Sequence, residues 1–151
     1  MRIIKTKGGF GKVPKAFACT ILEDEKRVLF LIRKDMNGIE RVLLPCVMVY
    51  SGNNPVAKMG EEFLLQTGIE AQVEGIAFEG RYNYGNKRKK AFIPLLVFAV
   101  KARRMQAKPG PGFAGFRWLS IKDALILDKK KEIRLEKWVF WLFREMLETN
   151  R

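Results

Sequence analysis

Glu62 is the side chain in this sequence best suited to metal or acid–base chemistry, and its neighbours decide what it can do. On a helix, the residues three and four positions further on share its face, and these are Leu65 and Gln66. One carboxylate beside a leucine and an amide is a poor ligand set for Mg²⁺. Glu62 is therefore a metal or catalytic candidate only if the fold adds acids such as Glu74 or Glu79. The alternative is a structural carboxylate that bonds a nearby loop.

The composition excludes several other kinds of site. The chain has no histidine, which removes the commonest general base and the usual catalytic triads. Its two cysteines, Cys19 and Cys46, are too few for a disulfide framework, and we expect both to be small buried side chains. No apolar run approaches the roughly 18 residues that span a bilayer, and the start of the chain has no apolar signal region. We therefore predict a cytoplasmic protein without a membrane partner.

Positive charge is concentrated in two segments of the chain. Lysine and arginine number 29 against 16 acids, a net charge of +13. Residues 1–15 hold five basic residues and residues 81–108 hold nine, with no acid in either segment. The rest of the chain sums to −1. Charge confined in this way predicts a polyanion partner such as RNA, although a solvated basic surface is the alternative.

The basic segment 81–108 begins with a short stretch in which five cations lie around two tyrosines. Cations contact phosphates, and aromatic faces stack on unpaired bases, so this pattern is typical of single-stranded nucleic-acid binding. The alternative is a solvated loop whose tyrosines pack on the sheet. The candidate contact residues are Arg81, Tyr82, Tyr84, Lys87, Arg88, Lys89, Lys90, Arg103 and Arg104.

The elements that must position these residues form one mixed α/β (α+β) domain, predicted over residues 16–151 behind a basic arm at 1–15. Asn54 as N-cap, Pro55 at the first helical position and Gly68 beyond the end predict a helix over 55–67. Ser120 begins a shorter helix. The predicted strands span residues 16–22, 27–33, 69–80, 91–101 and 116–119. Residues 40–50 are also mostly apolar, but Pro45 excludes their second half from a central paired strand.

A long final helix is predicted over residues 129–149. Residues 138–143 are all apolar, so apolar side chains point in every direction around this helix. One face is expected to pack on the sheet. Another is expected to meet a second copy of the chain, as a homodimer, or a partner protein.

Residues 44–69 resemble the signature of the Nudix superfamily. In words, that signature is a glycine, five residues, a glutamate, seven residues and then Arg-Glu-apolar-x-Glu-Glu-x-Gly-apolar, and it fits here without a gap. The matching residues are Pro45, Gly52, Pro55, Glu62, Phe63, Gly68 and Ile69. The family's usual strand before a short helix is matched further on by Arg117, Trp118, Leu119 and Ser120. The resemblance spans residues 16–123 and implies an α/β/α sandwich with a mixed sheet.

The chain departs from this signature at the positions that carry the family's chemistry. In the family, carboxylates on the helix gather divalent cations that neutralise a pyrophosphate and activate water. The departures are Cys46 and Val47 at the glycine pair, Asn53 at the first glutamate, Glu61 at the arginine, and Leu65 and Gln66 at the paired glutamates. The resemblance therefore implies the fold without most of the metal ligands, and no cofactor is expected.

Three functions are compatible with this sequence. The first is a Nudix-like protein that has lost pyrophosphohydrolase activity and binds RNA or another polyanion through residues 1–15 and 81–108. The second is a divergent hydrolase that acts on a nucleoside diphosphate-linked substrate with Mg²⁺ and Glu62. The third is a nucleotide-binding or protein-interaction module, whose base pocket would be lined by Phe113, Phe116 and Trp118.

Overall fold

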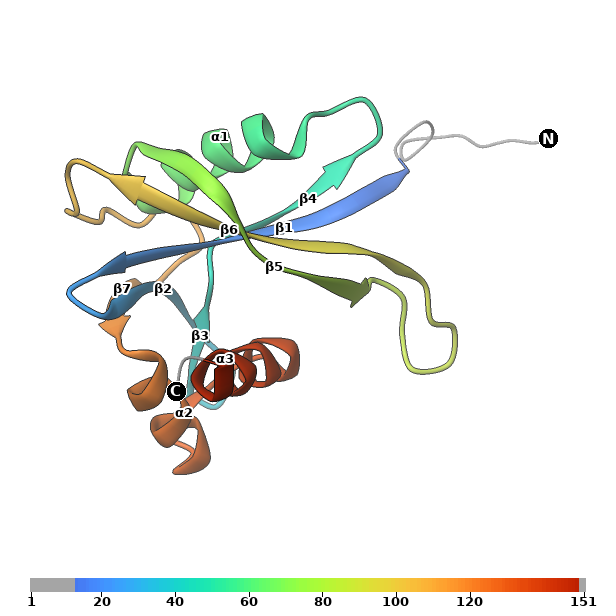
Figure 1. Ribbon diagram of the computed structural model, residues 1–151. Coiled ribbons are helices and arrows are strands. Elements are labelled where there is room, and N and C mark those ends of the chain that lie inside the picture. Colours follow the sequence, from blue (N-terminus) through green and yellow to red (C-terminus); the bar gives the residue numbers. More distant parts are fainter. Residues whose placement is uncertain (1–12, 150–151) are drawn as a thin grey trace.

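The computed structural model of the protein describes residues 13–149 (Figure 1). Its strands and helices are β1 (Pro14–Asp24), β2 (Arg27–Lys34), β3 (Glu40–Leu43), β4 (Cys46–Tyr50), α1 (Pro55–Thr67), β5 (Ala71–Asn83), β6 (Phe92–Ala102), β7 (Gly115–Leu119), α2 (Ile121–Lys129), β8 (Ile133–Arg134) and α3 (Lys137–Thr149). Residues 1–12, most of the predicted basic arm, lie outside the described part. Lys15 belongs to β1, and the division into arm and domain stays a prediction.

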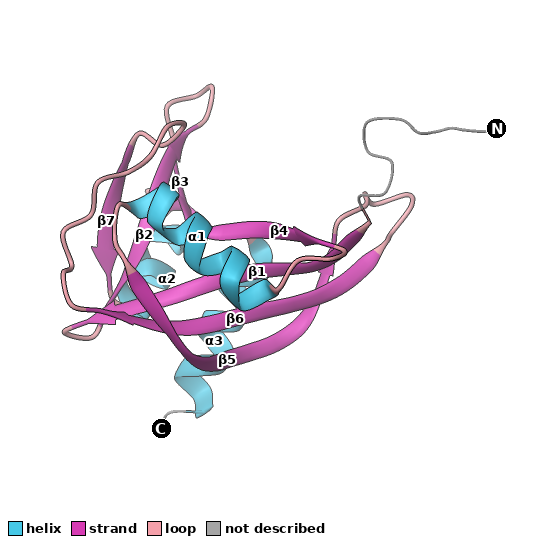
Figure 2. Ribbon diagram, turned by 90° about the horizontal axis from the view of Figure 1, so that it is seen from above, coloured by secondary structure: helices cyan, strands magenta, loops and turns pink. Residues whose placement is uncertain are grey.

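The strands form a mixed sheet in two halves that meet along β1 and β2. In one half, β1 pairs parallel with β6 and antiparallel with β4, and β5 is antiparallel to β6. In the other half, β2 is antiparallel to both β3 and β7, and β8 is parallel to β3. Helix α1 covers one face, and α2 and α3 lie on the opposite side (Figures 1 and 2). The predicted α/β/α sandwich with a mixed sheet and a C-terminal helix is confirmed.

Each side of the sheet has its own apolar core, because neighbouring strand residues point to opposite faces. Phe30 packs with Phe143 of α3 in the first core, with the two rings edge to face at 5.7 Å. Leu29, the residue before it in β2, packs with Met59 and Phe63 of α1 in the second. These buried side chains hold the helices against the sheet. Each large apolar side chain that is fully buried contributes roughly 1.5–3 kcal/mol to stability.

Helix α1 has the predicted bounds, and the predicted residues set them. The Asn54 side-chain oxygen accepts hydrogen bonds from the amides of Val56 and Ala57, at 2.9 and 3.2 Å. Gly68 ends the helix in the left-handed conformation at φ 74°, where an added Cβ would lie only 2.9 Å from Lys108. A side chain would be strained there, so glycine is required.

The two cysteines are joined as a disulfide, which corrects the prediction of two separate thiols. Cys19 of β1 lies directly opposite Cys46 of β4, with Cα atoms 4.1 Å apart. Cys19 is fully buried, as expected, whereas Cys46 is half-buried. The sequence could not show this pairing, because the register of β1 against β4 brings together residues that are 27 positions apart.

The C-terminal helix begins at Lys137 and not at residue 129, so the predicted span of 129–149 is wrong at its start. Just after α2, Lys131 adopts a left-handed backbone conformation with φ 62°, so the helix does not continue. The chain then forms β8 beside β3. The Asp128 carboxylate accepts the amide of Leu135 at 2.9 Å and fixes this turn. Ile133 and Leu135 are buried with strand-like alternation, which overrides the local helical pattern.

The outer face of α3 keeps two large apolar side chains exposed, Trp141 and Leu147. Val139, Leu142 and Phe143 are buried, whereas Trp141 is 62% exposed, with the guanidinium of Arg144 5.4 Å from its ring. The predicted dimer or partner contact through this helix stays a prediction. No helix within residues 13–149 is long and apolar enough to cross a membrane.

Candidate functional site

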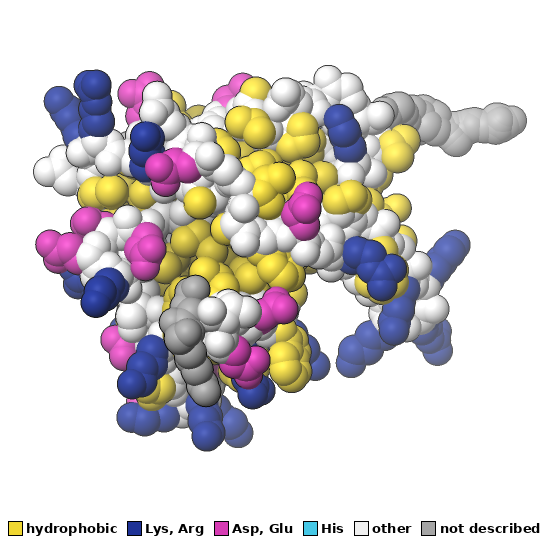
Figure 3. Space-filling view, viewed as in Figure 1, with side chains coloured by type: hydrophobic (Ala, Val, Ile, Leu, Met, Phe, Trp, Pro, Cys, Tyr) yellow, Lys and Arg dark blue, Asp and Glu magenta, His cyan; other side chains and the backbone are white. Residues whose placement is uncertain are grey.

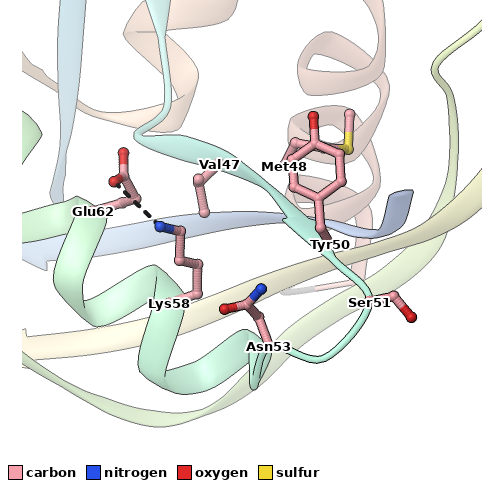
Figure 4. Close-up of a pocket in the computed structure, with 7 residues that line it drawn as sticks. All are labelled: Val47, Met48, Tyr50, Ser51, Asn53, Lys58 and Glu62. Carbon is pink, nitrogen blue, oxygen red and sulfur yellow. Dashed lines mark ion pairs between the residues drawn. The ribbon is translucent and has the colours of Figure 1, made fainter. Parts of the chain in front are cut away.

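A pocket of about 470 Å³ lies between α1, β4 and the loop that joins them (Figure 4). One wall consists of β4 side chains, and the other of the side of α1 that carries Lys58 and Glu62. The lining residues are Val47, Met48, Tyr50, Ser51, Asn53, Lys58 and Glu62. Its size suits a small-molecule ligand. The sequence-predicted Glu62 therefore lies where a bound ligand could contact its carboxylate.

Inside the pocket, the Glu62 carboxylate is faced by donors on two sides. The Lys58 ammonium, one turn earlier on α1, lies 3.9 Å from Glu62 and 3.8 Å from Glu61. The Gln66 amide, one turn later, lies 3.5 Å from Glu62 and donates to the Cys46 carbonyl at 2.8 Å. Glu62 is 24% exposed, so its partners take much of its surface.

The residues around Glu62 do not make a set of magnesium ligands. Mg²⁺ takes oxygen ligands in octahedral geometry, usually one or two carboxylates with water and phosphate oxygens. Leu65 is 62% exposed beside Glu62 and offers no oxygen. The two acids that the sequence offered as helpers lie elsewhere: Glu74 pairs with Lys101 at 3.9 Å, and Glu79 is exposed on β5. Within residues 13–149, no three His, Cys, Asp or Glu side chains are grouped closely enough to hold a metal ion.

Comparison with solved structures decides the fold. A Nudix hydrolase from Nitrosomonas europaea is similar with a TM-score of 0.67 at 16% identity, covering 92% of both chains. A MutT protein from Methanosarcina mazei Go1 gives 0.67 at 18%, covering 91% of this chain and 95% of the other. This chain has the Nudix fold.

The E. coli ORF135 protein is also similar, with a TM-score of 0.66 at 13% identity over 89% of each chain. By sequence, the chain matches no family model and no curated protein. The likeness therefore concerns the Nudix architecture, and the predicted Nudix resemblance is confirmed at that level. The chemistry has to be argued from the side chains of this chain.

The second candidate region is the loop between β5 and β6, whose backbone is held by two asparagine side chains. The Asn83 oxygen accepts the amides of Gly85 and Ala91, each at 3.0 Å. The Asn86 oxygen accepts the amides of Arg88 and Lys89, at 2.9 and 2.7 Å. Such side-chain-to-backbone bonds are the usual way in which asparagine builds turns. This loop therefore has a defined conformation.

Four exposed cations follow one another in this loop: Lys87, Arg88, Lys89 and Lys90, called the loop cations below. Figure 3 shows lysine and arginine side chains gathered at the end of the β5–β6 hairpin, at the lower right. Within residues 13–149, no acidic side chain forms an ion pair with any of them; the ion pairs of this chain lie elsewhere. Their charge is available to an anionic partner.

The aromatic residues near the loop differ in what they can contact. Tyr82 is half-buried and stacks on Phe17 with centroids 4.1 Å apart, and burial, with a smaller effect of the Glu136 charge, raises its pKa above the usual value of 10.0. Tyr82 therefore packs on the sheet, as the alternative interpretation of the loop expected. Tyr84 is 44% exposed and Phe92 is 49% exposed.

Phe92 is a candidate that the sequence analysis missed. It pairs with Asn83 across the hairpin, and the Arg81 guanidinium lies 4.9 Å from the centre of its ring. Strand alternation places Phe92 and Arg81 on the face opposite to Tyr82. The sequence contains a signal for it, because Phe92 lies two residues after the basic run, but the pattern there predicts only the strand over 91–101.

The basic segment 81–108 is not one continuous patch. Arg103 and Arg104 are exposed at the far end of β6 from the loop cations. With about 3.3 Å of rise for each residue, the eleven residues of β6 separate the two groups by roughly 30 Å. The candidate contact residues therefore form two separate groups, with Arg103 and Arg104 apart from the loop cations.

The three residues predicted for a base pocket lie away from the pocket of α1. Trp118 is half-buried against the core beneath α1, and Phe116 is exposed on β7. Phe113 has the Arg33 guanidinium 4.7 Å from the centre of its ring. None of them lines the described cavity, and a base-binding role for them stays a prediction.

Proposed function

We propose that this Nudix-fold protein binds single-stranded RNA or a related polyanion through the β5–β6 loop and does not split phosphoanhydrides. The observation that carries the proposal is the ordered loop with four consecutive cations and no acidic partner.

The physical basis is the release of counterions from phosphates by fixed cations. Each phosphate neutralised on a single strand makes the plot of log affinity against log salt concentration steeper by roughly 0.7. Because the Asn83 and Asn86 side chains already hold the loop backbone, less conformational entropy is lost on binding. Tyr84 and Phe92 add exposed rings on which unpaired bases stack. Single-stranded RNA uses both kinds of contact, whereas a duplex hides its base faces.

The lack of hydrolysis follows from the surroundings of Glu62. A hydrolytic site of this kind needs cations to neutralise the pyrophosphate and to generate hydroxide. Here the candidate ligand has a lysine ammonium on one side and an amide on the other. Because the chain has no histidine, the usual alternative base is also missing.

The test compares two four-residue variants of equal charge change. K87A/R88A/K89A/K90A removes the loop cations. K122A/K129A/K130A/K137A removes four exposed lysines of α2, its C-cap and α3. Binding to a fluorescent single-stranded RNA of roughly 15 nucleotides is measured by anisotropy at several salt concentrations, with EDTA present.

We expect the loop variant to bind at least about 30-fold more weakly and its salt slope to fall by about 3, while the α2/α3 variant changes by less than about threefold. Equal losses in the two variants would show that affinity follows net charge alone, and the assignment to the loop would then be wrong. Circular dichroism spectra that match the wild type confirm that both variants fold.

A further inference from the structure

The pocket between α1 and β4 contains the positively charged side chain of Lys58. Lys58 precedes Glu62 by four residues and Glu61 by three, so that all three side chains share one side of the helix. Figure 4 shows the Lys58 side chain extending along the pocket toward the Glu62 carboxylate. The side chain of Lys58 is only 33% exposed, so the helix and pocket hold much of its length in place.

We propose that the Lys58 ammonium is the built-in cation of this pocket and keeps divalent metal ions away from Glu62. A metal ion bound to the Glu62 carboxylate would lie within a few ångströms of the ammonium, where the two positive charges repel each other. In a partly enclosed site this repulsion is larger than in water.

The opposite side of the carboxylate supports the same inference. The Gln66 amide group is turned toward Glu62 and the Cys46 carbonyl, so it presents hydrogens there and not an oxygen. A bound metal ion needs acceptor atoms around it, whereas this carboxylate is surrounded by donors. Lys58 and Gln66 together therefore satisfy Glu62 in the way that a cation otherwise would.

The consequence is a pocket in which the charges of the two ionised lining residues, Lys58 and Glu62, balance without any metal. Any ligand of this cavity would bind independently of divalent ions. This inference concerns α1 and does not depend on RNA binding by the β5–β6 loop, which involves other residues. The two are tested with separate variants and separate measurements.

The experiment adds carboxylates to α1 and then asks whether Lys58 still prevents metal binding. L65E/Q66E places two further carboxylates three and four residues after Glu62, on its own face of the helix. Mn²⁺ binding is measured by electron paramagnetic resonance and by calorimetry for this double variant, and for the same variant with K58M added. K101M is the matched control, because Lys101 also pairs with a glutamate at 3.9 Å but lies on β6.

We expect no saturable Mn²⁺ binding by the wild type. In the L65E/Q66E background, K58M should tighten Mn²⁺ binding at least about tenfold, and K101M should change it by less than about twofold. If K58M and K101M have equal effects, Lys58 does not exclude the metal. Saturable binding by the wild type that E62Q abolishes would also overturn the inference.

A second pair of variants covers the case in which L65E/Q66E does not fold. Q66E gives up the hydrogen bond to the Cys46 carbonyl, whereas Leu65 is exposed and tolerates a change. L65E with and without K58M keeps that bond and repeats the comparison with one added carboxylate. The same ordering of Mn²⁺ affinities is expected, and its absence counts against the proposal.

Discussion

The pocket of α1 and the β5–β6 loop differ in whether their charged side chains are paired. In the pocket, Lys58 is paired with Glu61 and Glu62 on a partly buried helix face. In the loop, the four loop cations are exposed, and their backbone is held by asparagines, which carry no charge. Paired charges already neutralise each other and interact only weakly with a ligand. Exposed like charges repel each other, so they interact most favourably with an anion that binds. The region that the fold resemblance favours is thus the weaker binding candidate.

The largest effect that sharpens this comparison is expected from the two exposed rings beside the loop. F92A should weaken binding of single-stranded RNA by roughly 5- to 100-fold, because a stacked base contributes about 1–3 kcal/mol, and Y84A should act similarly. Neither change should alter the salt slope, since no phosphate contact is lost. Fluorescence anisotropy across a salt series gives both quantities.

Phe116 provides the control for this prediction. It is an exposed phenylalanine on β7, away from the loop, so F116A should leave affinity within about twofold. A larger loss would favour the base pocket that the sequence predicts at Phe113, Phe116 and Trp118. A salt slope that changes in F92A together with the affinity would mean that the Arg81 contact with the ring, and not stacking, had been lost.

How far the sequence predicts each region depends on whether its signals are local. Helix α1 is bounded by Asn54, Pro55 and Gly68, which act on their own backbone, and its limits were predicted correctly. The start of α3 was wrong, because burial of Ile133 beside β3 is a contact between distant parts of the chain. Local capping is therefore more predictable from one sequence than strand pairing is.

The same distinction holds for the candidate site. Glu62 and the loop cations were found from residue type and spacing. The disulfide between Cys19 and Cys46, the exposure of Phe92 and the separation of Arg103 from the loop all depend on register and strand length. Lys58 was missed because its partners are ordinary helix neighbours, and only the pocket around them gives that pairing a meaning.

A smaller effect is expected from neutralising Glu62. E62Q should leave RNA affinity within about twofold and change the free energy of unfolding by less than about 1 kcal/mol, because the Lys58 pair is partly exposed. Neither protein should release nucleotide or phosphate from a panel of nucleoside diphosphate-linked substrates with Mg²⁺. Magnesium-dependent turnover that E62Q removes would instead establish the divergent hydrolase and reverse the comparison between the two regions.

The smallest effect concerns Tyr82, which belongs to the hairpin but packs into the core. Because burial raises its pKa above 10.0, the unfolded chain loses this proton before the folded chain does. Tyr82 therefore contributes stability that is complete below about pH 10 and is lost as the pH rises through the folded-state pKa. Urea unfolding between pH 9 and pH 11, approximate limits set by that pKa, should show a steeper loss of unfolding free energy in the wild type than in Y82F.

Lysines titrate in the same range but are common to both proteins, so the difference isolates Tyr82. Equal slopes would mean that the ring is hydrated in solution; Tyr82 would then be open to a base, and the stacking surface of the loop would extend onto the inner face of the hairpin.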